Sequence, residues 1–141
     1  MARFMMIMRG TDETDAAFAA SGISLDEVME QMGRFNQELI DAGVLVAAEG
    51  LEEASKGVVV DYSQTPPVVT DGPYGETKEL FNGFWILETP TQEEAVEWAK
   101  RAPLGRGTKI EVRRVHGVED FPQDNEWIQK EIEWREQLGT N

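Results

Sequence analysis

Asp71 begins the stretch of this sequence that is richest in side chains able to do acid–base chemistry. It precedes Gly72 and Pro73, and it lies between an apolar pair at 68–69 and an apolar segment at 84–87. Gly72 can adopt backbone angles that are closed to other residues, and Pro73 disfavours the helical region for the residue before it. The sequence therefore predicts a defined bend with the Asp71 carboxylate at its entrance.

Glu49 is a second carboxylate in a notable place, directly after five apolar residues at 44–48. If Glu49 and Asp71 converge at the edge of a sheet, their charges repel and burial opposes ionisation, so one of them would hold its proton near neutral pH. Such a pair could supply one general acid and one general base. Glu49 and Asp71 are therefore the predicted catalytic residues.

The residues that follow Asp71 are candidates for binding a small ligand. Glu76, Lys78 and Glu79 would line the mouth of the pocket, and Lys78 would be available to an anionic group. Arg113 belongs to an alternating strand pattern, but the sequence does not assign its side chain to a face. The predicted ligand-binding set is Gly72, Pro73, Tyr74, Glu76, Lys78, Glu79 and Arg113.

Each of these residues also has a purely structural interpretation. The Asp71 carboxylate could close an Asx-turn by accepting the backbone N–H two residues on. Glu49 could simply end a strand where the chain turns into solvent. Glu76 and Glu79 could lie in a solvated, helix-like turn, and Lys78 could pair with a neighbouring glutamate, which contributes little at a surface.

The composition excludes several kinds of site and partner. The 141 residues include no cysteine, so disulfides, thiolate metal sites and cysteine nucleophiles are excluded. A single histidine excludes a multi-histidine metal site but leaves a carboxylate Mg²⁺ or Mn²⁺ site open. No metal or cofactor is predicted. Thirteen basic residues against 27 acidic ones give a net charge of −14, which argues against nucleic acids and anionic membranes as partners.

The N-terminal apolar run at 4–8 is too short for a signal-peptide core or a membrane span, so we expect a cytoplasmic protein.

The pattern of the chain predicts an α+β fold, a ferredoxin-like split βαβ unit with an inserted hairpin. We expect one domain over residues 1–116 and an acidic helical extension over 117–141. The predicted strands are 4–8, 44–48, 57–62, 67–70, 83–88 and 109–115. The predicted helices are 25–42, one that opens with a capping box at 91–94, and 124–138. Residues 10–21 are expected to form a loop or a loose helical turn.

Three of the predicted strands, at 4–7, 58–60 and 84–87, are apolar on both faces. Strands of this kind are buried on both sides, yet two helices can cover only one face of the sheet. A second copy of the same sheet is the expected cover, so a homodimer is predicted. Trp127 and Trp134 in the extension indicate that its helix packs on the domain or on a partner.

The motifs that identify a family are GVLV at 43–46, EGL at 49–51, TDGPY at 70–74, ETKE at 76–79, GFW at 83–85, the helix at 94–98 and EVR at 111–113. Over roughly residues 3 to 115 the chain resembles the YCII-related family, in particular the DGPF-domain branch named for its Asp-Gly-Pro-Phe motif. The resemblance implies a dimeric α+β barrel of two ferredoxin-like sheets. Tyr74 stands in place of the phenylalanine of that motif.

Other members of the wider family are thought to use a histidine–aspartate pair. His116 lies just past the last strand and does not match that position, so we expect it to be a surface residue. Two functions remain open. One is a small cofactor-free lyase or isomerase that acts on a small organic molecule by carboxylate acid–base chemistry. The other is a non-catalytic module for a small ligand or a partner. The resemblance links this module to sigma-factor stress regulation, because the branch is often encoded beside extracytoplasmic-function sigma factors.

Overall fold

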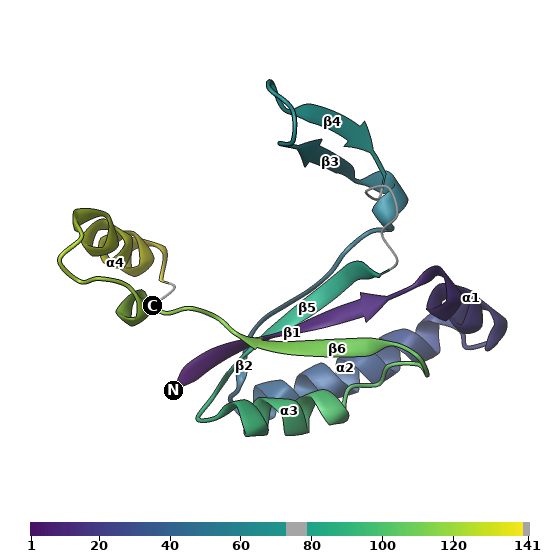
Figure 1. Cartoon of the computed structure of the whole chain (residues 1–141). Helices are drawn as coiled ribbons and strands as arrows, with labels where there is room; N and C mark the ends of the chain where they lie inside the picture. The colour runs from purple at the N-terminus through teal and green to yellow at the C-terminus, as the bar shows by residue number, and fades with distance from the viewer. Residues whose placement is uncertain (73–78, 140–141) are drawn as a thin grey trace.

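The computed structural model describes residues 1–72 and 79–139 (Figure 1). A four-stranded sheet carries two helices on one face, while a hairpin and the C-terminal helix extend away from it. The strands are β1 (Ala2–Gly10), β2 (Leu45–Gly50), β3 (Val58–Asp61), β4 (Val68–Asp71), β5 (Leu80–Thr89) and β6 (Lys109–Arg114); the helices are α1 (Asp12–Ala20), α2 (Leu25–Asp41), α3 (Gln92–Lys100) and α4 (Glu126–Leu138), with short 3₁₀ turns η1 (Ala54–Lys56) and η2 (Val118–Asp120).

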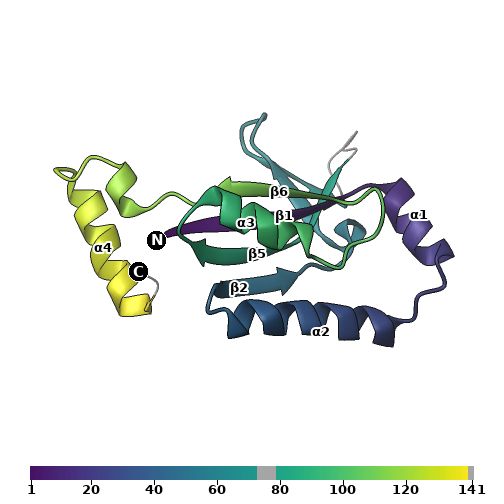
Figure 2. The ribbon, with the colours of Figure 1, turned by 90° about the horizontal axis from the view of Figure 1, so that it is seen from below.

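The main sheet has the strand order β2-β5-β1-β6, and every neighbouring pair is antiparallel. Helix α2 leads from β1 toward β2, and α3 joins β5 to β6, so both crossover helices lie on the same face (Figure 2). This arrangement is consistent with the ferredoxin-like α+β fold expected from the sequence. The inserted hairpin of β3 and β4 forms a separate two-stranded sheet.

Helix boundaries follow the local capping signals closely. The Ser24 hydroxyl accepts from the backbone N–H of Glu27, and the Thr91 hydroxyl accepts from that of Glu94, as expected for the starts of α2 and α3. The segment left as a loop or loose turn is in fact the nine-residue helix α1. Helix α4 starts at Glu126, two residues after the start expected at 124, because the side chain of Asn125 caps it.

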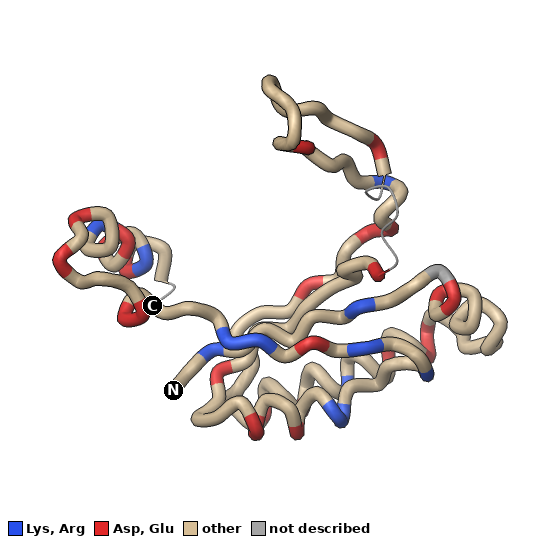
Figure 3. Tube along the Cα trace, in the orientation of Figure 1, with Lys and Arg blue, Asp and Glu red and all other residues tan. Residues whose placement is uncertain are grey.

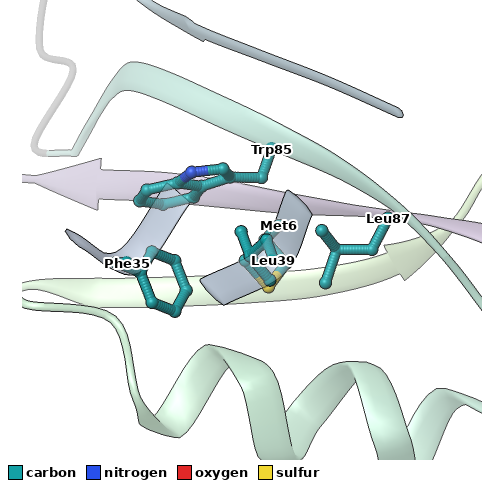
Figure 4. Close-up of a cluster of buried hydrophobic side chains, with 5 residues drawn as sticks. All are labelled: Met6, Phe35, Leu39, Trp85 and Leu87. Atoms are coloured by element: carbon teal, nitrogen blue, oxygen red, sulfur yellow. The ribbon is translucent and has the colours of Figure 1, made fainter. Parts of the chain in front are cut away.

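The core lies between the sheet and α2 and α3. Its buried members are Met6, Phe35, Leu39, Trp85 and Leu87 (Figure 4). Helix α2 carries an apolar stripe, and only part of it enters the core. Leu25, Met29 and Ile40 belong to that stripe but remain 73%, 64% and 55% exposed, because the stripe is wider than the strip of helix that faces the sheet.

The open face is the face of the main sheet opposite α2 and α3. Side chains alternate along a strand, so the neighbours of buried Met6 and Trp85 point to this face. Its apolar residues are Met5, Ile7, Phe84 and Ile86, which are cross-strand partners and only half-buried. The two-sided apolar character expected for β1 and β5 is therefore confirmed, whereas in β3 the side chains of Val58 and Val60 are 62% and 47% exposed.

Two segments extend away from the body (Figure 1). The hairpin rises on the side opposite the helices, and α4 lies beyond the end of the sheet near the N-terminus. Trp127 and Trp134 on α4 contact each other with ring centroids 6.4 Å apart, yet they are 57% and 49% exposed. Within one chain α4 therefore does not bury its tryptophans. None of the described helices combines the length and apolarity that crossing a membrane requires.

Candidate functional site

Glu49 lies near the end of β2, an edge strand of the main sheet, with Phe84 of β5 as its cross-strand partner. The preceding residue, Ala48, is the partner of buried Trp85. The Glu49 side chain is exposed, and within the described residues its carboxylate makes no hydrogen bond or ion pair. It is therefore a carboxylate available to a ligand.

A cleft of about 260 Å³ opens beside Glu49, between α2 and the end of the β2–β5 pair. Most of its surface is apolar, from Met8, Met32, Ala48, Phe84 and Trp85, and its polar side chains are Glu49 and Asn36. One carboxylate against an apolar wall is an arrangement that can hold a small organic molecule and accept a proton from it.

Asn36 fixes one wall of this cleft and was missed by the sequence analysis. Its side-chain oxygen accepts a 2.8 Å hydrogen bond from the indole N–H of Trp85, and Phe35 packs edge-on against the same indole at 5.4 Å. A signal was present, because Asn36 follows Met32 by four residues and so falls on the apolar stripe of α2. A polar residue in such a stripe indicates a buried hydrogen-bonding partner.

Asp71 ends β4 at the base of the hairpin, opposite Val58 of β3, and it is exposed. Gly72 has a φ of +76° and donates a 2.8 Å hydrogen bond to the carbonyl of Gly57, so the chain does bend after Asp71. The Asx-turn interpretation needs an N–H on residue 73, which is proline and has none. Asp71 does not line the Glu49 cleft, and its carboxylate has no partner within the described residues.

Glu79 and Arg113 belong to a chain of ion pairs on the open face. Glu79 pairs with Arg9 and, at 3.2 Å, with Lys109. Arg9 also contacts Glu111 at 3.1 Å, and Glu111 pairs with Arg113, which lies opposite Met5 on this face. The hydrogen bond from Lys109, together with the charge of Arg9, lowers the pKa of Glu79. Both predicted residues are thus engaged by neighbouring side chains.

The basic residues are unevenly placed (Figure 3). Although the chain is acidic overall, β1 and β6 lie side by side and carry Arg3, Arg9, Lys109, Arg113 and Arg114. The remaining predicted ligand-binding residues, Pro73, Tyr74, Glu76 and Lys78, lie outside the described residues. In the part of the chain that is described, no three histidine or acidic side chains lie together as a metal ion would require.

His116 is exposed, as expected, and its Nδ1 lies 3.1 Å from the Asp120 carboxylate just after β6. This contact is at the other end of β6 from the Lys109–Glu79 pair and does not touch the Glu49 cleft. The histidine–aspartate pair that the resemblance raises is therefore not part of this site.

The fold is that of a ferredoxin-like α+β protein, and among the described residues of its edge strand β2 the Glu49 carboxylate is unpaired. The chain belongs to the YCII-related family, since the model of the YCII-related domain matches residues 2–139. It is also similar to "Uncharacterized protein R00369" of Rhizobium meliloti (strain 1021), with 27% identity over 75 residues. That similarity covers 53% of this chain and 60% of the relative.

Proposed function

We propose that the Glu49 cleft is the site at which this protein acts on a small organic molecule. Glu49 serves as the general base or acid of a cofactor-free lyase or isomerase. Two observations carry the proposal: the Glu49 carboxylate is unpaired among the described residues of the edge strand β2, and Glu49 lines a largely apolar cleft of about 260 Å³. Substrate bound against Met32 and Trp85 would present its acidic C–H or O–H to that carboxylate.

Asp71 is proposed as the second carboxylate. Segment 50–57 connects Glu49 of β2 to Val58 of β3, and Val58 is the strand partner of Asp71. Both acidic residues therefore flank the same connection. Gly72, Pro73, Tyr74, Glu76 and Lys78 would then contact the ligand, with Glu79 and Arg113 held nearby by their ion pairs.

The working form is proposed to be a cytoplasmic homodimer of the DGPF-domain branch, in which two open faces pack against each other as a dimeric α+β barrel. The half-buried Met5, Ile7, Phe84 and Ile86 support this because they form an apolar surface that α2 and α3 do not cover. Within the YCII-related family, the TDGPY motif at 70–74 supports the DGPF-domain branch.

A base-catalysed elimination tests the proposed chemistry without knowledge of the natural substrate. In 5-nitrobenzisoxazole, a base removes the C3 proton, the N–O bond breaks, and a coloured cyanophenolate forms. A positioned general base contributes about 10²–10⁴-fold, so we expect Glu49→Gln to lower the protein-catalysed rate at least about tenfold. Absorbance of the phenolate gives the rate directly.

Glu52→Gln is the matched control, because Glu52 is an exposed glutamate three residues away that does not line the cleft. Its rate should equal that of the wild type. Equal rates for Glu49→Gln and Glu52→Gln would reject Glu49 as the base.

A non-catalytic binding module is the second candidate, favoured by a different observation. Trp127 and Trp134 leave a paired aromatic surface exposed on α4, which is the kind of surface that a protein partner covers. In this case the cleft would hold a ligand without turning it over, and the α4 surface would bind a partner. The DGPF resemblance links such a module to stress regulation by sigma factors. Elimination rates that do not depend on Glu49 would favour this function.

A further inference from the structure

A second and larger cavity lies under α1, at the end of the sheet beyond the Glu49 cleft. Its volume is about 490 Å³, within the range of pockets that bind small organic molecules. Met8 and Met32 line both hollows, so they separate the two. The other apolar side chains among the described residues that line the cavity are Phe18, Ile23, Val28, Pro103 and Leu104.

A β-bulge turns one polar side chain into this cavity. The register between β1 and β5 shifts between Met8, which is opposite Gly83, and Arg9, which is opposite Phe81. Asn82 is therefore the extra residue, and it lines the cavity while Phe81 stays beside Phe84. Bulges re-aim side chains in this way and are common next to binding sites.

Gly10 leaves the space that the Asn82 amide occupies. A Cβ on Gly10 would lie 2.6 Å from Asn82 Nδ2 and 3.2 Å from the Thr14 hydroxyl oxygen. The Thr14 hydroxyl is already bonded to the backbone of Thr11, whereas the Asn82 side chain makes no hydrogen bond with any described residue. An amide with an unused donor and acceptor thus lies at a mostly apolar cavity.

Charge is confined to the rim of this cavity. Of the described residues that line it, Asp15 alone is charged, and it is exposed to solvent. Arg106 lines an adjoining hollow of about 310 Å³ and is also exposed. An ionised ligand would lose its hydration here without gaining a buried counter-charge, so a neutral ligand is favoured.

Helix α1 covers the cavity without a well-packed apolar face. Phe18 is its one large apolar residue, and Phe18 and Ile23 are 50% and 40% exposed although both line the cavity. A molecule in the cavity would therefore bury side chains that the protein alone leaves partly in water.

We propose that the cavity under α1 is a binding site for a small neutral molecule with an apolar body and one hydrogen-bonding group, recognised by the Asn82 amide. The site is separate from the Glu49 chemistry and does not depend on it.

N-phenyl-1-naphthylamine is a suitable probe, because it is neutral, apolar and carries one N–H group. We expect its fluorescence to rise on binding to the full-length protein. Methyl NMR of the same sample should show shifts for Ile23 and Val28, which line only the α1 side, and smaller shifts for Ala48, which lines only the Glu49 cleft. Shifts at Ala48 or Ile86 with none at Ile23 and Val28 would overturn the proposal.

Val28→Trp fills the cavity and should weaken probe binding at least about tenfold. Val69→Trp makes the same change at a residue of β4 that is 61% exposed, and it should leave binding unchanged. This variant controls for non-specific binding of the probe to an added tryptophan. Equal affinities for the two folded variants would overturn the proposal. The wild-type NMR map remains decisive if Val28→Trp does not fold.

The role of Asn82 has its own test. Asn82→Ala should weaken binding of N-phenyl-1-naphthylamine by about two- to tenfold, the effect of one net hydrogen bond. Binding of 1-benzylnaphthalene, which has CH₂ in place of N–H, should change little. The same loss for both probes, or no loss for either, would show that Asn82 does not recognise the polar group.

Discussion

The indole N–H of Trp85 donates a 2.8 Å hydrogen bond to the side-chain oxygen of Asn36, which joins the centre of β5 to the middle of α2. Trp85 is 2% exposed, so no solvent can replace this partner. The bond holds the indole in the wall of the Glu49 cleft while Phe35 supports it edge-on. The shape of the cleft therefore depends on one polar pair in the core.

Asn36→Ala should destabilise the protein by roughly 1–3 kcal/mol, because it leaves the buried indole N–H unsatisfied. Urea unfolding at one fixed protein concentration measures this. Gln37→Ala removes an exposed hydrogen bond to Asp41 one residue along the same helix and should change stability by no more than about 0.5 kcal/mol. Equal midpoints for the two variants would mean that the Trp85–Asn36 bond contributes nothing.

Asp120 should make stability depend on acid pH. Hydrogen bonds from Arg114, the Gly117 N–H and the His116 ring lower the pKa of Asp120 well below its ordinary value of 3.8. A lowered folded-state pKa stabilises the protein above the unfolded-state value, and this contribution is lost as the pH falls through the folded-state value. Asp120→Asn should therefore lower Tm slightly at neutral pH, with a smaller difference at about pH 3.

Glu119→Gln is the control for that measurement, because Glu119 contacts Arg114 only at 3.6 Å and is 71% exposed. Its Tm should stay nearer that of the wild type at every pH. A constant difference between wild type and Asp120→Asn from neutral to acid pH would contradict the assigned cause.

If a second copy covers the open face, light scattering at micromolar concentration should give a particle of about twice the chain mass of 15.8 kDa. Interfaces of obligate dimers commonly bury more than about 2,000 Å² in total. Ile86→Asp would place an unpaired carboxylate in that interface and should give monomers. Met29→Asp puts the same group on an exposed part of α2 and should remain dimeric. A wild-type particle of 15.8 kDa would remove the dimer.

Asp71→Asn tests whether the two carboxylates share a site. If they do, removing the Asp71 charge relieves repulsion, and the Glu49 carboxyl should lose its proton at lower pH than in the wild type. NMR titration of the carboxyl carbons follows Glu49 in both proteins. Identical titration curves for Glu49 would show that Asp71 does not share a site with it.

Much of the fold could be predicted because its signals are local. The start of α2 at Leu25 follows from Ser24 and the apolar spacing behind it, and the strands around the hairpin follow from their alternation and the turn between them. Helix α1 was harder, because its alanine-rich sequence has no apolar stripe and its cap uses threonine at both positions, Thr11 and Thr14.

The candidate site was less predictable, because it depends on distances between separate elements. Nothing in the spacing of Glu49 and Asp71 indicates that β4 pairs only with β3 and not with the main sheet. The bulge at Asn82 is a register shift between β1 and β5, and the sequence of either strand alone does not reveal how the two strands pair. Asn36 could have been inferred from its place on the stripe, but its partner Trp85 could not.

Both edges of the main sheet are poor templates for another strand. β6, at one edge, alternates Lys109, Glu111 and Arg113 along the open face, and charged side chains on an edge oppose pairing with a new chain. β2, at the other edge, is interrupted by a register shift between Leu45 and Ala47. Continued pairing of further chains at the sheet edges, which would build fibres, is thereby disfavoured. An apolar sheet surface can therefore stay exposed during folding at a lower risk of aggregation.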